Sequence, residues 1–337
     1  MSEIKKKQKA NHTKGLQHTK KETANRRNKK RKSNKFKKVL VVLVFIVVIL
    51  ATLFIIKMNE NGWTYGGLIA TFLGHNSKTI DKLDTIYVVV TGESQNLTDT
   101  IMVCAYNPKQ DKVSIMSIPR DTYTGKNKNK ATASDKINTL YNKNPQELIN
   151  KINDITGLNI MNYVNVDTKG LRDLVDAVGG INYEVPIDMD YDDDTQNLHI
   201  HLKAGYQLLD GNKAEQLVRF RHNNDGSTYP ASYGDNDLGR MRTQREFIKE
   251  LIHQIKDKQL VLNLNKYIQI AQSNVETNMD INSMINYVPY LVDFDLEKLD
   301  SVALPGSPKK CNGVWLYIPS KVKIEEVVNE KFNSLAN

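Results

Sequence analysis

Apolar residues are distributed along this chain in three ways: they are rare in the first 38 residues, continuous over residues 39–56 and periodic afterwards. The continuous segment has no charged side chain, and Thr52 is its only polar residue. As an α-helix its 18 residues extend about 27 Å, close to the ~30 Å hydrocarbon core of a bilayer. The pattern therefore predicts a transmembrane helix over residues 39–56.

Beyond this segment, glycines interrupt short apolar stretches over residues 57–83, where we expect a juxtamembrane linker. A β-branched run then predicts a buried strand over residues 85–90. Turn residues at 107–111 predict a hairpin between strands at 100–106 and 112–118.

Apolar residues at helical spacing follow the hairpin. Asn144 and Pro145 are typical of a helix start, and Gly157 of a helix end. Because strands and helices interleave through one long domain over residues 84–337, the sequence predicts an α/β fold. Three more helices are predicted, over residues 168–178, 247–255 and 320–334.

Charge is distributed unevenly along the chain. Residues 1–38 hold 16 Lys and Arg against Glu3 and Glu22, a local net charge of +14. The whole chain carries +9, so residues 39–337 carry −5. By the positive-inside rule, the tail stays in the cytoplasm and the domain after the membrane helix lies outside the cell. The tail is too polar to form a core, so we expect it to be disordered.

The same charge distribution separates several classes of protein. A nucleic-acid binder carries its positive charge on the folded domain, whereas this domain is mildly acidic, so no nucleic-acid partner is expected. A cleavable signal peptide is disfavoured, because the basic tail is long and no small-residue cleavage site follows the apolar segment.

Cys104 is interpreted as a small buried residue, with a single Cys104–Cys311 bridge as the open alternative.

Charged residues at the ends of the predicted hairpin are candidates for chemistry. Asp99 precedes its first strand, and Arg120 and Asp121 follow its second strand. Because these ends of an antiparallel pair coincide, we expect Asp99 to lie close to Arg120 and Asp121. Two carboxylates and a guanidinium can hold a divalent cation beside a phosphate, although strand-end Asp and Arg are more often solvated turn residues.

Further cations occur late in the domain. We expect Val218-Arg-Phe-Arg-His222 to form a strand that presents Arg219 and Arg221 on one face, where arginine can bind phosphate in a bidentate manner. Ion pairing with nearby acids is the competing interpretation. Arg240 lies near the start of the predicted helix that carries Gln244, a position suited to anion binding. His222 could serve as a base or be structural.

Together these segments resemble the LytR–CpsA–Psr family. The resemblance covers about residues 84–250, with a looser match over 260–337. The residues that carry it are Thr98-Asp-Thr-Ile-Met, Val113 to Asp121, Lys136-Ile-Asn138, Leu174 to Gly180, Gly205 to Gly211, Arg219-Phe-Arg221 and Asp237-Leu-Gly-Arg240 with Gln244.

The resemblance implies an extracellular catalytic domain of three α-β-α layers around a mixed central sheet. Its expected activity is transfer of a glycopolymer, such as teichoic acid or capsule, from a polyprenyl-pyrophosphate carrier in the membrane lipid to peptidoglycan. Mg²⁺, with Mn²⁺ as an alternative, is expected on Asp99 and Asp121. By the same analogy the catalytic residues are Arg120, Asp121 and Asp237, and the pyrophosphate-binding residues are Arg120, Lys136, Arg219, Arg221, Arg240 and Gln244.

Two positions depart from the family pattern. Gly92-Glu93 stands where an Asp is common, and Arg242-Thr-Gln244 replaces the usual Arg-Gln pair, which puts one basic contact in doubt. We also expect residues 223–236 to form a mobile loop near the site. Competing functions are a non-catalytic scaffold that binds lipid-linked glycopolymer, a membrane-bound transcriptional attenuator and a pyrophosphate hydrolase.

Overall fold

A computed structural model describes residues 43–94, 97–141, 144–234, 236–257 and 260–335. The chain divides into two compact units, residues 1–60 and residues 61–337, which are described separately below.

The first unit contains helix Leu43–Asn61, whose 19 residues make it the one helix in the described part of the chain that is long and apolar enough to cross a membrane. Every side chain over residues 43–56 is exposed. Since exposed apolar surface is unfavourable in water, this helix is suited to a lipid environment. The helix extends to Asn61 rather than ending at Ile56. The predicted tail over 1–38 and the first predicted helical residues, 39–42, lie outside the described residues.

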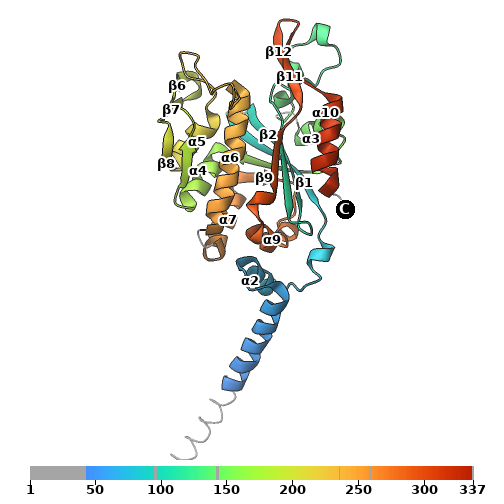
Figure 1. Ribbon diagram of the computed structural model, residues 1–337, viewed down its shortest axis with the longest axis vertical. Coiled ribbons are helices and arrows are strands. Elements are labelled where there is room, and N and C mark those ends of the chain that lie inside the picture. Colours follow the sequence, from blue (N-terminus) through green and yellow to red (C-terminus); the bar gives the residue numbers. More distant parts are fainter. Residues whose placement is uncertain (1–42, 95–96, 142–143, 235, 258–259, 336–337) are drawn as a thin grey trace, which may run out of the picture. The chain divides into compact units, whose positions relative to one another are not determined.

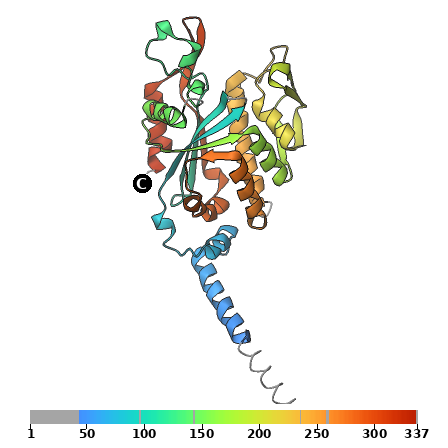
Figure 2. The ribbon, with the colours of Figure 1, turned by 180° about the vertical axis from the view of Figure 1, so that it is seen from behind.

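The second unit is built on a six-stranded mixed sheet in the order β10-β3-β2-β1-β4-β9 (Figures 1 and 2). β1 pairs in parallel with β4 and antiparallel with β2, which continues antiparallel to β3 and so confirms the predicted hairpin. β10 is parallel to β3, and β9 is antiparallel to β4. The strands are β1 (Ile86–Ser94), β2 (Leu97–Asn107), β3 (Lys112–Ser117), β4 (Asn162–Asp167), β9 (Val275–Thr277) and β10 (Leu299–Ala303).

Helices cover both faces of this sheet, which confirms the three-layer α-β-α fold (Figure 1). One layer holds α3 (Pro145–Thr156) and α10 (Lys321–Lys331). The other holds α4 (Thr168–Ala177), α5 (Gly211–Arg219), α6 (Asn236–Asp257) and α7 (Leu260–Asn274).

Three two-stranded sheets and several short helices complete the unit. The strands pair as β5 (Ile181–Val185) with β8 (Gly205–Leu209), β6 (Met189–Asp193) with β7 (Leu198–Leu202), and β11 (Gly306–Cys311) with β12 (Val314–Pro319). The short helices are α2 (Tyr65–Phe72), α8 (Ile281–Ile285) and α9 (Val288–Asp293).

Alternation along the central strands divides their side chains between the two helical layers. Val89 and Val103 are fully buried in the core that also contains Ile149 of α3. Their neighbours Val90 and Met102 line a cavity on the opposite face of the sheet. This period of two is the geometric consequence of the pleat, and it gives the sheet one packed face and one ligand-accessible face.

The predicted ends of α3 are confirmed. The Asn144 side chain accepts the backbone N–H of Gln146 at 2.8 Å, and Pro145 is the first helical residue. Gly157 ends the helix with φ 74°, a left-handed conformation that glycine adopts without a steric penalty.

The segment expected as a linker contains helix α2, which packs against α9. Asp293 Oδ1 accepts the backbone N–H of Gly66 at 3.0 Å, and Thr64 donates its hydroxyl to the same carboxylate. A Cβ on Gly66 would lie 2.0 Å from the Pro289 carbonyl oxygen, so this close approach requires glycine. Gly66 in the predicted linker thus permits close packing of α2 on α9.

Both cysteines are free, so the alternative of a Cys104–Cys311 bridge does not hold. Burial raises the pKa of the Cys104 thiol to about 12. A thiol with such a raised pKa is a poor nucleophile at neutral pH, which agrees with a packing role for Cys104.

Ile152→Ala tests the packed face of the sheet. Ile152 is fully buried between α3 and the sheet, and its truncation should lower the free energy of unfolding by about 2–5 kcal/mol. Urea unfolding of the full chain in detergent measures the change. Asn150→Ala is the matched control on the exposed face of α3, with an expected change below about 0.5 kcal/mol. Equal effects of the two substitutions would contradict this packing.

Candidate active site

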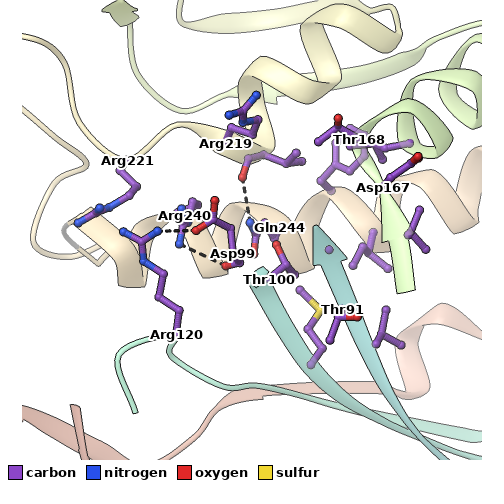
Figure 3. Close-up of a pocket in the computed structure, with 18 of the residues that line it drawn as sticks. Thr91, Asp99, Thr100, Arg120, Asp167, Thr168, Arg219, Arg221, Arg240 and Gln244 are labelled. Atoms are coloured by element: carbon purple, nitrogen blue, oxygen red, sulfur yellow. Dashed lines mark hydrogen bonds and ion pairs between the residues drawn. The ribbon is translucent and has the colours of Figure 1, made fainter. Parts of the chain in front are cut away.

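A cavity of ≈ 320 Å³ lies between the central sheet and the layer formed by α4, α5, α6 and the β6–β7 hairpin. Its volume falls within the range of small-molecule sites. Charged and polar groups gather in one part of it, as Figure 3 shows for Arg120, Asp99 and Arg240. Asp167 and Thr168 line another part of it (Figure 3). Apolar side chains line much of the remainder: Val90, Met102, Val166, Leu171, Leu174, Leu198, Val218, Phe247, Ile248 and Leu251.

The predicted approach of the hairpin ends is confirmed for Arg120 and Asp99, because Arg120 Nη1 donates a hydrogen bond to Asp99 Oδ1. The loop that carries Arg120 is held by backbone hydrogen bonds on both sides. Asn138 N donates to Arg120 O at 3.2 Å, and Tyr317 N donates to Asp121 O at 2.8 Å. The guanidinium therefore extends from a fixed backbone.

Asp237, in the first turn of α6, brings three guanidinium groups together. Its Oδ1 accepts a hydrogen bond from Arg240 and lies 3.9 Å from Arg120 Nε and 3.8 Å from Arg221 Nε. The Arg240 side chain is only 4% exposed. With Asp99 and Asp237 as the carboxylates among these five side chains, the group has a net charge of +1. This excess favours an anionic ligand.

Two features show that Arg221 and Arg240 are incompletely neutralised, whereas Arg120 is stabilised by two carboxylates. Burial lowers the pKa of Arg221, and the positive charges of Arg120 and Arg240 lower it further. Burial alone would also lower the pKa of Arg120, but the negative charges of Asp99 and Asp237 outweigh burial and raise it. The Nε atoms of Arg221 and Arg240 are buried and make no hydrogen bond. Buried donors without acceptors are costly, and phosphate oxygens would satisfy them.

The predicted strand through Arg219 and Arg221 is wrong. Arg219 is the last residue of α5, and Phe220 is its C-cap. The helical period of Ala214 and Leu217, both fully buried, continues to this point, and Asp210 caps the helix start. Helix packing therefore overrides the β-propensity of a short Val-Arg-Phe segment. Arg219 and Arg221 still line the cavity, although not as neighbours on one strand face.

Arg219 and Gln244 contribute to the cavity in different ways. Arg219 Nη1 donates to Glu215 Oε1 at 3.0 Å, and its guanidinium lies apart from the other arginines (Figure 3). Gln244 Nε2 donates to Val218 O at 2.9 Å and so ties α6 to the end of α5. Gln244 thus positions the segment that leads to Arg221.

Asp121 and Lys136 form a separate ion pair, with Lys136 Nζ 2.9 Å from Asp121 Oδ1. Neither is among the described residues that line the cavity. Of the two predicted metal ligands, Asp99 lines the cavity, whereas Asp121 lies outside the lining and is paired with Lys136. In the described residues no third carboxylate joins them into a three-ligand cluster. These donors fit an ion that substrate phosphates would also coordinate, as Mg²⁺ commonly is, rather than an all-protein cage.

Sequence reasoning missed the β6–β7 hairpin, which contributes Tyr191 and Gln196 to the cavity. Tyr191 makes an edge-to-face contact with His222, with ring centroids 5.4 Å apart. The alternation of polar and apolar residues over 189–193 and 198–202 was the available signal for this hairpin.

The expected mobile loop is attached to this hairpin. Asn223 Oδ1 accepts the backbone N–H of Asp190 at 2.7 Å, and Asn224 Oδ1 accepts that of Asp192 at 2.7 Å. The first residues after His222 are therefore held against β6 by side-chain amides, and the mobility of residues 223–236 stays a prediction.

The two departures from the family pattern lie in different environments. Gly92 lines the cavity in β1. Thr243 is buried beside Tyr233, with its Oγ1 3.1 Å from the Tyr233 hydroxyl, and Arg242 lies over the Tyr233 ring at 4.3 Å. Neither Arg242 nor Thr243 is among the described residues that line the cavity, so Arg240 is the arginine by which this part of α6 contributes to it.

Fold and site together define a protein with one apolar, membrane-length helix and a cavity suited to an amphiphilic anion. The model of the LytR–CpsA–Psr family matches residues 57–333. The chain belongs to this family.

Named relatives come from Bacillus species. The chain is 27% identical over 234 residues to the polyisoprenyl-teichoic acid–peptidoglycan teichoic acid transferase TagV of Bacillus subtilis, covering 68% of this chain and 58% of TagV. It is 28% identical over 244 residues to the transferase TagU of Bacillus anthracis, covering 71% of this chain and 74% of TagU. The chain thus spans little more than half of TagV.

The crystal structure of B. subtilis TagV is similar to this chain, with a TM-score of 0.62 and 25% identity. The similarity covers 75% of this chain and 98% of the TagV structure. The three-layer fold is therefore shared.

The substitution Asp237→Asn tests whether the carboxylate of Asp237 holds the guanidinium groups of Arg120, Arg221 and Arg240 together. Without its charge the three guanidinium groups repel each other, so the free energy of unfolding should fall by about 1–3 kcal/mol. Inorganic pyrophosphate should then raise the unfolding temperature more than in the wild type, because its oxygens replace the lost acceptor. Thermal unfolding with and without pyrophosphate measures both effects.

The control is Asp154→Asn, which removes an exposed carboxylate paired with Lys151 at 3.2 Å. Its expected effect is below about 1 kcal/mol, and pyrophosphate should not change it. An Asp237→Asn protein as stable as the wild type, with no larger response to pyrophosphate, would disprove the shared role of Asp237.

Proposed function

We propose that the chain is a membrane-anchored phosphotransferase that moves a glycopolymer from a polyprenyl-pyrophosphate carrier to peptidoglycan. The observation that carries the proposal is a cavity in which an apolar lining meets a partly buried group of guanidiniums with a net positive charge. A polyprenyl pyrophosphate has the matching parts, an apolar chain and a pyrophosphate. The names of TagV and TagU support teichoic acid as the glycopolymer class.

In the proposed reaction, a peptidoglycan hydroxyl oxygen attacks the phosphorus that bears the glycan, and the hydroxyl proton passes to the leaving phosphate or to solvent. The bond from this phosphorus to the bridging oxygen breaks, its electron pair remains on that oxygen, and polyprenyl phosphate leaves. Negative charge accumulates on the phosphoryl oxygens and the leaving group, so catalysis depends on charge stabilisation and alignment. Arg120, Arg221 and Arg240 are placed to stabilise this charge, and Arg219 adds a further cation in the cavity.

Asp237 has a positioning role in this proposal, because its Oδ1 is shared among three guanidiniums. Asp99 would hold Mg²⁺ or Mn²⁺ together with pyrophosphate oxygens, and the bound ion would supply further neutralisation of phosphate charge. Asp121 would join as a ligand only after leaving Lys136, so we propose that the Asp121–Lys136 pair orients the Arg120 loop in the ligand-free protein.

The membrane anchor supports the same substrate. A helix that holds the domain at the bilayer surface keeps the cavity near a lipid-linked donor. The tail, with its net charge of +14 over residues 1–38, favours a cytoplasmic N-terminus and an extracellular domain, where peptidoglycan is found.

Arg221→Ala tests the transferase. The full chain in liposomes is supplied with polyprenyl-pyrophosphate-linked glycan, a peptidoglycan oligosaccharide and Mg²⁺, and attached glycan is measured. Removing one charge-stabilising donor should lower the transfer rate about 10²–10³-fold. Arg242→Ala is the matched control, since Arg242 lies on α6 outside the cavity, and its rate should stay within about twofold of the wild type. A chelator should abolish transfer.

The other outcomes separate the competing functions. Release of glycan phosphate without attachment would indicate a hydrolase. Tight binding without turnover over several acceptors would indicate a scaffold. Equal rates for Arg221→Ala and Arg242→Ala would contradict the proposed site.

A further inference from the structure

Four side chains with metal-ligand chemistry project from one face of the β6–β7 hairpin. Asp190 and Asp192 lie on β6, and His199 and His201 lie on β7. The strand register pairs Asp190 with His201 and Asp192 with His199. Because residues two apart share a face and paired residues are directly opposite, all four lie on the same face. None of these four residues is among the described residues that line the cavity.

The opposite face of the hairpin is packed. Met189, Leu198, Ile200 and Leu202 belong to the hydrophobic core beneath α5 and α6, and Tyr191 packs against it. The register is therefore fixed, because a shift by one residue would bury the aspartates and histidines. The four polar side chains are held outward together by the same packing that forms the cavity wall.

Donor atoms of three members of this set already lie close together, and His199 joins them through its contact with Asp192. His199 Nδ1 is 2.6 Å from Asp192 Oδ1, and His201 Nδ1 is 2.8 Å from Asp190 Oδ1. His201 Nε2 lies 3.4 Å from Asp192 Oδ1. Ligand atoms of Asp190, Asp192 and His201 fall within 4.8 Å of one another, and throughout the described residues this is the one group of three that does so.

We propose that Asp190, Asp192, His199 and His201 form a binding site for a transition-metal cation of the Zn²⁺ class. Two imidazoles and two carboxylates supply the nitrogen and oxygen ligands of tetrahedral zinc, whose donor atoms lie about 3.3 Å apart. The side chains are exposed, so small rotations bring them to this spacing. The imidazoles disfavour Mg²⁺ and Ca²⁺, which take oxygen ligands.

The surrounding charge supports cation binding. Asp188, Asp193 and Asp194 add carboxylates on or beside β6, and Lys203 pairs with Asp188 at 2.9 Å. The hairpin therefore carries a negative potential that concentrates cations. Carboxylates alone would be an ordinary acidic surface; the two histidines opposite them make it a mixed ligand set.

An ion bound here would cross-link two strands that form the cavity wall. Tyr191 lies between Asp190 and Asp192 in sequence, points to the opposite face, lines the cavity and contacts His222. The backbone of the same two aspartates is held by Asn223 and Asn224, which follow Arg221 by two and three residues. A metal on the hairpin would thus stabilise the segment that positions Arg221, independently of the ion expected on Asp99.

Zinc titration of the metal-free, untagged full chain in detergent tests the proposal, with affinity measured by calorimetry. The expected result is one strong Zn²⁺ site per chain that the double variant His199→Gln/His201→Gln weakens by roughly a hundredfold or more, since loss of a supporting residue alone costs 10–100-fold. Saturating Zn²⁺ should raise the unfolding temperature of the wild type and not that of the double variant. X-ray absorption at the zinc edge should show two imidazole ligands.

Matched variants isolate the site. His253→Gln removes an exposed histidine on α6, 3.9 Å from Glu250, and should leave zinc affinity unchanged. Asp99→Asn should also leave it unchanged, which separates this site from the cavity. The proposal is overturned if wild type and double variant bind Zn²⁺ equally, if neither binds it, or if Mg²⁺ competes with Zn²⁺ at equal concentration.

Discussion

The carboxylate of Asp237 is the interaction on which the rest of the site depends. Three arginines reach it: Arg120 after β3 and Arg221 after α5 come from other elements, and Arg240 comes from the next turn of the same helix, α6. Like charges at this spacing repel strongly in a partly buried site, so they can converge only around a shared anion. The sheet, α5 and α6 are thereby held in the arrangement that leaves room for a phosphate group.

Much of this arrangement follows from local sequence rules. The turn after Asn107 fixes an antiparallel hairpin, and antiparallel geometry alone places Asp99 beside Arg120, as the structure confirms. Helix caps such as Asn144 and Gly157 were readable for the same reason, because they act through residues two to four positions away. Contacts of this kind need no knowledge of tertiary packing.

The rest depended on packing that one sequence does not display. A short Val-Arg-Phe-Arg segment has strand propensity, but the buried face of α5 extends the helix to Arg219. Glycine at position 66 was interpreted as an interruption in a juxtamembrane linker, yet it permits contact with the Pro289 carbonyl. The alternation of the β6–β7 hairpin was readable, but its place beside the segment after Arg221 was not, because Asn223 and Asn224 bind β6 from more than thirty residues away.

Titration of the full chain with farnesyl pyrophosphate tests the central claim that one cavity binds both the apolar chain and the pyrophosphate. We expect tighter binding of farnesyl pyrophosphate than of either inorganic pyrophosphate or farnesol. Arg221→Ala should weaken binding of farnesyl pyrophosphate and of inorganic pyrophosphate. Leu171→Trp should weaken binding of farnesyl pyrophosphate and of farnesol. Equal affinities for farnesol and farnesyl pyrophosphate, or for the two pyrophosphates, would contradict the claim.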